Sequence, residues 1–271
     1  GNYLMDSRKI IIDILFKNKD EILEVERINE EKIIKLLSEQ LMIPAFYFNL
    51  KRLKIKNSFS KDFFKYIRQI YQINKNRNKE LIIEINEICQ ILDLHNVKYC
   101  FLKGAALLKR QIFDDIGERM VGDIDLLISS KDFEKGISII KKFGYYEINK
   151  ENDYRFYKTR HFPRLKKNNK IFALEIHEKI SEKKIKGFEK IEYEIIQTIS
   201  ENCPNNLYML LINIINHQIN DKGFNKCSYS LKSIYDCCSI LNKSKKTCKN
   251  YIRNTESSVI KNYFFVMNLV T

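Results

Sequence analysis

The stretch that decides the fold is residues 97–128, VKYCFLKGAALLKRQIFDDIGERMVGDIDLLI. Its two ends, residues 97–102 and 124–128, are short runs rich in branched and aromatic side chains, which is typical of β-strands. Between them, Gly104 precedes a segment of helical character, residues 105–112. The sequence therefore predicts a strand, a glycine-containing turn, a helix and a second strand.

Two aspartates mark the second of these strands. Asp123 and Asp125 alternate with Ile124 and Leu126, and a period of two places both carboxylates on one face of a strand. Two like charges side by side are unfavourable unless a positive group lies between them. A divalent cation meets this need, because hard cations bind carboxylate oxygens. The pattern predicts a metal site on this strand.

Length and composition define the class of protein. The chain has 271 residues, 44% of them hydrophobic and 12% aromatic, which is enough for a buried core. No apolar run approaches the ~20 residues that span a bilayer, and the N-terminus has no signal-peptide pattern. The seven cysteines are odd in number and lack CxxC spacing, which favours reduced thiols over disulfides or a zinc site. We therefore expect a cytoplasmic protein without membrane association.

The net charge of +14 fits an anionic partner such as a nucleoside triphosphate or RNA. Lysine far outnumbers arginine, however, and isoleucine and asparagine are abundant throughout the chain. The base composition of a genome produces such a pattern without any function. The charge alone therefore leaves RNA as an open partner and does not assign it.

The chain before the central stretch has helical periodicity. Apolar residues recur at helical spacing after a cap signal at Asp6, until Pro44 interrupts the pattern. Residues 60–93 have the pattern of a long amphipathic helix, for which we predict an interruption near residues 74–78.

The chain after the central stretch alternates between helix and strand before it becomes helical. Ser130 has the position of a helix cap, and Gly144 that of the residue that ends this helix. Residues 154–180 have the pattern of a β-hairpin, whose returning strand places Glu175 and His177 on one face.

Together these patterns predict an α+β fold. A small mixed β-sheet over residues 89–180 forms the core. An N-terminal helical segment, residues 1–88, and a C-terminal helical segment, residues 181–271, flank it.

The order of the elements resembles the polymerase-β-like nucleotidyltransferase superfamily, and more closely a bacterial family described as uncharacterised nucleotidyltransferases. The pattern of that family is a Lys-Gly turn, an Arg four residues before Asp-x-Asp-Leu-Leu, and a later acidic-x-His strand. In this chain the matching residues are Lys103-Gly104, Arg119, Asp123-Ile124-Asp125-Leu126-Leu127 and Glu175-Ile176-His177. The likeness is clearest over residues 90–180, and further on His217 and LKSIYD (residues 231–236) resemble the C-terminal part of the family.

The resemblance implies an enzyme that transfers a nucleoside monophosphate, most simply AMP from ATP. An acceptor oxygen attacks the α-phosphorus and pyrophosphate leaves, with two divalent ions ~3.5–4 Å apart between the reacting oxygens. It implies catalytic and metal-binding roles for Asp123, Asp125 and Glu175, with Mg²⁺ or Mn²⁺ as the cofactor.

The resemblance also implies a binding site for the triphosphate. Lys103 and Arg119 would neutralise its charge, with Arg119 able to hold it bidentately. Gly104 and Gly122 would lie against the nucleotide, with backbone N–H groups at the helix start holding the anion.

The chain departs from the wider superfamily at three positions. Ala105 follows Gly104 where Gly-Ser or Gly-Gly is usual, so a hydroxyl that would contact phosphate is missing. Gly122 stands where serine is frequent, and Glu175 where aspartate is commoner. None of these changes removes a metal ligand.

Several assignments stay open at this level. His161 and His177 have either a catalytic or a hydrogen-bonding role, and His217 and Asp236 fit packing or capping roles on helices. The acceptor is a small molecule, a peptide or a protein. Two alternatives remain: a toxin-type enzyme that adds nucleotides to tRNA ends, and a nucleotide-binding protein with a degenerate site.

Overall fold

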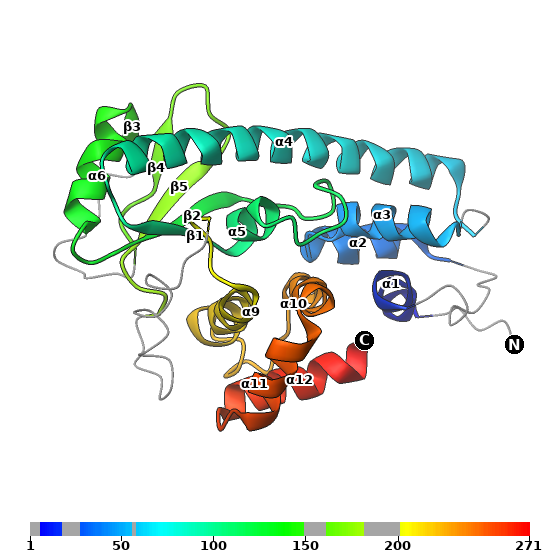
Figure 1. Ribbon diagram of the computed structural model, residues 1–271. Helices are drawn as coiled ribbons and strands as arrows, with labels where there is room; N and C mark the ends of the chain where they lie inside the picture. The colour runs from blue at the N-terminus through cyan, green and yellow to red at the C-terminus, as the bar shows by residue number, and fades with distance from the viewer. Residues whose placement is uncertain (1–5, 18–27, 56–57, 149–160, 182–200) are drawn as a thin grey trace, which may run out of the picture.

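Figure 1 shows the computed structural model of the chain, which describes residues 6–17, 28–55, 58–148, 161–181 and 201–271. Five strands form one sheet in the order β1-β2-β5-β4-β3, in which β2 and β5 are parallel and the other neighbours antiparallel. The predicted α+β fold with a mixed sheet is confirmed. The strands are β1 (Tyr99–Leu102), β2 (Asp123–Ile128), β3 (Tyr145–Glu147), β4 (Leu165–Lys167) and β5 (Ala173–His177).

Helices surround this sheet. The long helix α4 runs across the top of the molecule in Figure 1, above both the sheet and helix α3, while α9 to α12 lie below. No helix in the described ranges is long and apolar enough to cross a lipid bilayer. The division into three segments stays a prediction. The helices are α1 (Ser7–Phe16), α2 (Glu30–Glu39), α3 (Ile43–Leu53), α4 (Lys61–Leu94), α5 (Lys103–Lys109), α6 (Phe133–Lys142), α9 (Asn206–Ile215), α10 (Leu231–Lys243), α11 (Lys245–Asn254) and α12 (Ser258–Val270), with a π-helical segment (Asn216–Asn220) after α9.

Helix α4 is continuous, so the predicted interruption near residues 74–78 is wrong. The buried side chains of Asn74 and Asn78 donate hydrogen bonds to the loop that precedes β2. Asn74 Nδ2 lies 2.8 Å from the carbonyl oxygen of Gly117, and both amides reach that of Arg119, at 3.1 and 2.8 Å. The asparagines satisfy backbone groups of this loop and thereby fix it against the helix.

Gly117 in this loop packs against the ring of Tyr71 from α4. A Cβ atom at Gly117 would lie 2.7 and 2.9 Å from two ring carbons, and the ring is fixed because its hydroxyl donates to Asp115 at 2.6 Å. We expect Gly117→Ala to lower the free energy of unfolding by about 1–3 kcal/mol through overpacking. Gly122→Ala is the matched control, because nothing lies within 4 Å of the added carbon.

Urea denaturation of the two variants checks this expectation. Gly122→Ala is expected to stay within about 0.5 kcal/mol of the wild type. Equal stability of both variants would contradict the tight contact between the loop and α4.

The predicted order of strand, helix and strand is confirmed, but α5 covers Lys103–Lys109 rather than residues 105–112, so Gly104 lies in its first turn and not in a turn before it. Lys103 follows Leu102 directly and has a positive φ of 50°, which turns the chain from β1 into α5. Gly104 is needed for close packing, since a Cβ atom there would lie 2.9 Å from a methyl group of Val121. The turn therefore places Lys103 beside the end of the sheet.

Two expectations about α6 have different outcomes. Gly144 follows the end of the helix with a φ of +93°, as predicted for a left-handed terminating residue. Ser130 does not cap the helix, because α6 begins after Asp132, whose carboxylate accepts a hydrogen bond from the backbone N–H of Lys98 at 2.9 Å. The predicted cap is wrong because this long-range contact to the start of β1 is not visible in the local sequence.

The predicted hairpin is confirmed as an antiparallel pair, but β4 covers residues 165–167, where the sequence predicted the end of the first strand and the start of the turn. Strands β4 and β5 are antiparallel, with Leu165 opposite Leu174. Residues 154–160 of the predicted first strand lie outside the described residues. The chain then returns along β5, which brings Glu175 next to β2.

Candidate metal and nucleotide site

Three metal-ligating side chains meet on neighbouring strands. In the parallel pairing of β2 and β5, Asp125 lies opposite Glu175 and Leu127 lies opposite His177. Because His177 follows Glu175 by two residues, both side chains are on the same face of the sheet. One ligand atom from each of Asp125, Glu175 and His177 lies within 4.8 Å of the other two, and all three residues are buried. We call these three residues the acidic-histidine group.

Asp125 is the most strongly paired member of this group. Its Oδ1 atom lies 2.5 Å from Lys103 Nζ and 2.8 Å from His177 Nε2. Burial alone would raise the pKa of the Asp125 carboxyl, but the hydrogen bond from His177 and the charge of Lys103 lower the pKa to about 2. Asp125 is therefore ionised at neutral pH.

Arg164, just before β4, connects Asp123 with Glu175. Its Nε lies 2.6 Å from Glu175 Oε1, and its Nη2 lies 3.1 Å from Asp123 Oδ2. Burial raises the pKa of the Asp123 carboxyl, with Arg164 acting in the opposite direction. The three carboxylates of Asp123, Asp125 and Glu175 thus face one side of the sheet.

His177 is held in its neutral form. Burial lowers the pKa of its imidazole, although Asp125 acts to raise it. A neutral imidazole offers one nitrogen as a metal ligand. The ring of His161 lies beside it, with ring centroids 5.4 Å apart.

The chemistry of these donors fits a divalent cation. Carboxylate oxygens are the ligands that Mg²⁺ and Mn²⁺ prefer, and transition metals accept an imidazole nitrogen more readily than Mg²⁺ does. Asp125 and Glu175 would supply the oxygens and His177 the nitrogen. The mixed set therefore accommodates Mn²⁺ at least as well as Mg²⁺.

Asp125 and Glu175 of the acidic-histidine group line an open hollow of about 600 Å³, which is a usual size for a small-molecule site. Its other walls come from the start of α5, the loop before β2, the π-helical segment and the first turn of α10. All seven residues predicted for the site from the sequence line this hollow: Lys103, Gly104, Arg119, Gly122, Asp123, Asp125 and Glu175.

Arg119 differs from the other predicted phosphate ligands because its guanidinium is already engaged. Its Nε and Nη2 donate to the two carboxylate oxygens of Asp236 at 2.8 and 2.9 Å. Both residues are buried, with 8% of Arg119 and 1% of Asp236 exposed. This bidentate pair joins the loop before β2 to α10.

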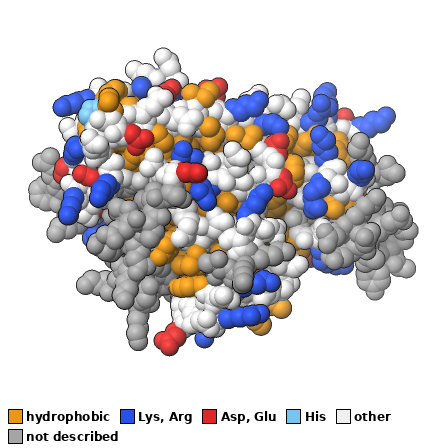
Figure 2. All heavy atoms as spheres, viewed as in Figure 1, with side chains coloured by type: hydrophobic (Ala, Val, Ile, Leu, Met, Phe, Trp, Pro, Cys, Tyr) orange, Lys and Arg blue, Asp and Glu red, His pale blue; other side chains and the backbone are white. Residues whose placement is uncertain are grey.

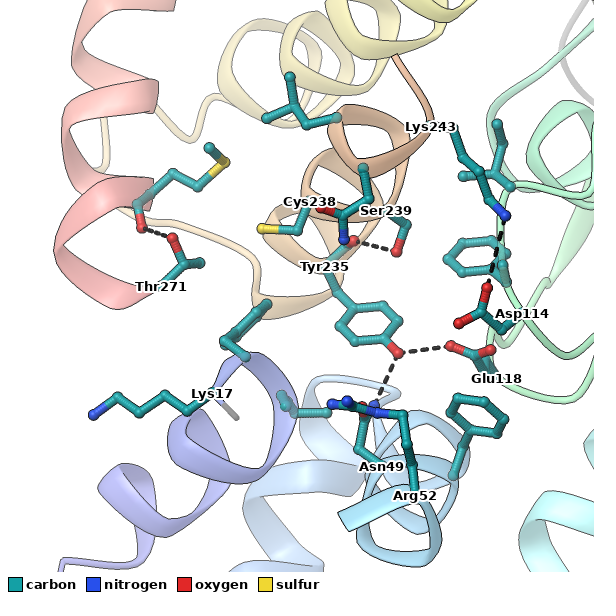
Figure 3. Close-up of a pocket in the computed structure, with 18 residues that line it drawn as sticks. Lys17, Asn49, Arg52, Asp114, Glu118, Tyr235, Cys238, Ser239, Lys243 and Thr271 are labelled. Carbon is teal, nitrogen blue, oxygen red and sulfur yellow. Dashed lines mark hydrogen bonds and ion pairs between the residues drawn. The ribbon is translucent and has the colours of Figure 1, made fainter. Parts of the chain in front are cut away.

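A second hollow, of about 660 Å³, is lined by the neighbours of this ion pair in the sequence, Glu118 and Tyr235 (Figure 3). At its wall the hydroxyl of Tyr235 donates to Glu118 at 2.7 Å and accepts from the amide of Asn49 at 2.9 Å. Glu118 and Tyr235 directly precede Arg119 and Asp236, so two adjacent contacts connect the loop to α10. Asp125 and Glu175 line the smaller hollow, and we place the site there.

His217 and Asp236 have partners that explain them without a catalytic role. His217 Nε2 accepts a hydrogen bond from the backbone N–H of Ser230 at 2.9 Å, and burial lowers the pKa of its imidazole. The contact ties the π-helical segment to the start of α10. Asp236 holds Arg119.

Two basic residues of the hollow were missed in the sequence. Arg164 directly precedes β4, which pairs with β5. The predicted hairpin places this basic residue opposite Glu175, and this position could have identified it from the sequence. Lys232 lies in the LKSIYD stretch, where its place on α10 gives no indication of what it faces.

Carboxylates on adjacent strands beside the start of a helix are the arrangement that the resemblance to nucleotidyltransferases implied. A family model described as uncharacterised nucleotidyltransferase matches residues 26–258, and the chain belongs to this family. It is therefore an enzyme of nucleotidyl transfer, with a nucleoside triphosphate as substrate. A comparison with curated proteins finds no match.

Proposed function

We propose that the protein transfers AMP from ATP to a small-molecule, peptide or protein acceptor and releases pyrophosphate. The observation that carries this proposal is the meeting of Asp125, Glu175 and His177 within 4.8 Å. Two of them, Asp125 and Glu175, line a hollow together with Asp123, Lys103 and Gly104. Such a group suits a divalent cation and an anionic substrate together.

In this proposal Asp125, Glu175 and His177 hold the cation, and Asp123 is the further carboxylate beside them. The cation, Mg²⁺ or Mn²⁺, neutralises charge on the triphosphate and activates the acceptor oxygen when bound. Glu175 is also placed to accept the proton of an acceptor hydroxyl. Arg164 balances the charges of Asp123 and Glu175.

The nucleotide lies, in this proposal, between the acidic-histidine group and the start of α5. Lys103, which pairs with Asp125 in the structure, would bind phosphate if Asp125 held a cation. Gly122 leaves open space, since nothing lies within 4 Å of where its Cβ would be. Arg119 contributes positive charge to the wall, while its bidentate hydrogen bonds remain with Asp236.

We place the reaction in the cytoplasm. All seven cysteines are free thiols in the structure, which suits a reducing compartment.

Incubation with each of the four α-labelled nucleoside triphosphates tests the proposal. The reactions contain Mg²⁺ or Mn²⁺ and either no acceptor, a cell extract, or tRNA, and mass spectrometry identifies pyrophosphate and labelled products. We expect label from ATP in an acceptor from the extract, with an equal amount of pyrophosphate, and no label with Glu175→Gln.

The other outcomes identify the alternatives. Label in tRNA would establish the toxin-type reaction in place of the proposed one. Binding of triphosphate without any pyrophosphate or label would indicate a degenerate site.

A further inference from the structure

The basic side chains that line the hollow differ in their partners. Three of the four Lys and Arg residues form ion pairs with carboxylates, at 2.5, 2.8 and 2.6 Å. Lys232 is the fourth, and in the part of the chain that the structure describes it has neither an ion-pair nor a hydrogen-bond partner. The three pairs are Lys103 with Asp125, Arg119 with Asp236, and Arg164 with Glu175.

Lys232 is only partly exposed, although no carboxylate among the described residues forms an ion pair with it. It lies in the first turn of α10, a helix of 13 residues, whose N-terminal end carries partial positive charge. Burial lowers the pKa of its ammonium group most, and the nearby charge of Arg119 lowers it further. The ammonium group is therefore only partly hydrated, and an anion that enters the hollow would interact favourably with it.

The acidic-histidine group and the neighbouring Asp123 carry negative charge toward the hollow. A divalent cation would neutralise only part of the charge of Asp123, Asp125 and Glu175 together with that of the substrate. The end of the triphosphate that leaves as pyrophosphate needs positive charge away from these carboxylates. Lys232 lies on the helical wall of the same hollow.

We infer that Lys232 forms a binding subsite for the β- and γ-phosphates of the nucleoside triphosphate, and thus for the departing pyrophosphate. This inference rests on the proposed function. The subsite recognises the polyphosphate and is indifferent to the base, because Lys232 presents a point charge.

Isothermal titration with tripolyphosphate, ATP and AMP, each with Mg²⁺, tests the subsite. Lys232→Ala is expected to weaken the binding of tripolyphosphate and ATP roughly ten- to a hundredfold, the range for a charge-assisted contact. Affinity for AMP is expected to change less than about twofold. Lys232→Arg is expected to recover much of the loss, since it restores the charge.

Lys243→Ala is the matched control. Lys243 lies on the same helix but borders the second hollow, where it is 3.7 Å from the exposed Asp114. The variant removes the same charge from α10 and is expected to bind all three ligands as the wild type does. Thermal melts of each variant confirm that the helix is folded.

The outcomes separate this inference from the proposed function. If the wild type binds ATP and Lys232→Ala binds it equally well, the subsite is refuted and the proposed function stands. If Lys232→Ala and Lys243→Ala weaken binding alike, general charge is responsible and the subsite is refuted. If the wild type binds neither ATP nor tripolyphosphate, both proposals fail.

Discussion

Replacing Asp125 by asparagine is expected to reduce nucleotidyl transfer by roughly a hundred- to a thousandfold or more, the range for the loss of one essential charged group in an active site. The variant removes the charge of the carboxylate that lies between Lys103, His177 and Glu175. Initial rates of pyrophosphate release measure the effect. Asp114→Asn, a change at an exposed carboxylate outside the hollow, is the control and is expected to keep the wild-type rate.

Asp125→Asn is also expected to lower the stability of the fold, and by more than Asp123→Asn does. Asp125→Asn leaves Lys103 and His177 without their charged acceptor, so we expect a loss of about 1–3 kcal/mol in the free energy of unfolding. Asp123→Asn is expected to cost less, because burial already raises the pKa of the Asp123 carboxyl and disfavours its charge. Near-wild-type turnover of Asp125→Asn would reject its role in the site.

The pH dependence of this stability difference has a defined sign. The pKa of Asp125 falls from 3.8 to about 2 on folding, so its contribution is complete above 3.8 and is lost as the pH drops through 2. The stability gap between wild type and Asp125→Asn should therefore be largest near neutral pH and shrink in acid. Urea denaturation at several pH values measures this gap, and a gap that widens in acid would contradict the assignment.

Replacing Asp236 by asparagine is expected to have the largest effect on stability, about 3–5 kcal/mol, because it leaves the buried charge of Arg119 without its partner. Urea denaturation measures the loss. Glu201→Gln is the matched control: it breaks the pair of Glu201 with Arg110, where 73% of the glutamate side chain is exposed. That exposed pair is expected to contribute less than about 1 kcal/mol.

A double replacement separates the charge from the packing. Arg119→Met combined with Asp236→Leu removes both buried charges, and we expect it to recover most of the stability lost in Asp236→Asn. Equal stability of Asp236→Asn and Glu201→Gln would show that the buried pair does not hold the loop to α10.

The sequence was sufficient to predict the central elements because their patterns are local. The alternation of Asp123 and Asp125 with aliphatic residues identified β2 and the face of its carboxylates. The spacing of Glu175 and His177 did the same for β5. Both are consequences of the two-residue period of a strand, and the structure brings Asp123, Asp125 and Glu175 to one hollow.

The parts that were missed depend on contacts between distant segments. The asparagines of α4 looked like an interruption, yet Asn74 and Asn78 bind a loop about forty positions later in the chain. The pairing of Arg119 with Asp236 spans 117 positions, so no local pattern indicates it. That Lys232 has no ion-pair partner among the described residues follows only from the assembled hollow.

A titration with Mn²⁺, followed by electron paramagnetic resonance, tests most directly whether the acidic-histidine group is the metal site. We expect the wild type to bind Mn²⁺, more tightly when ATP is present, and Asp125→Asn to bind it at least about tenfold more weakly. Asp114→Asn should bind as the wild type does. Equal Mn²⁺ affinity of the wild type and Asp125→Asn would contradict the account.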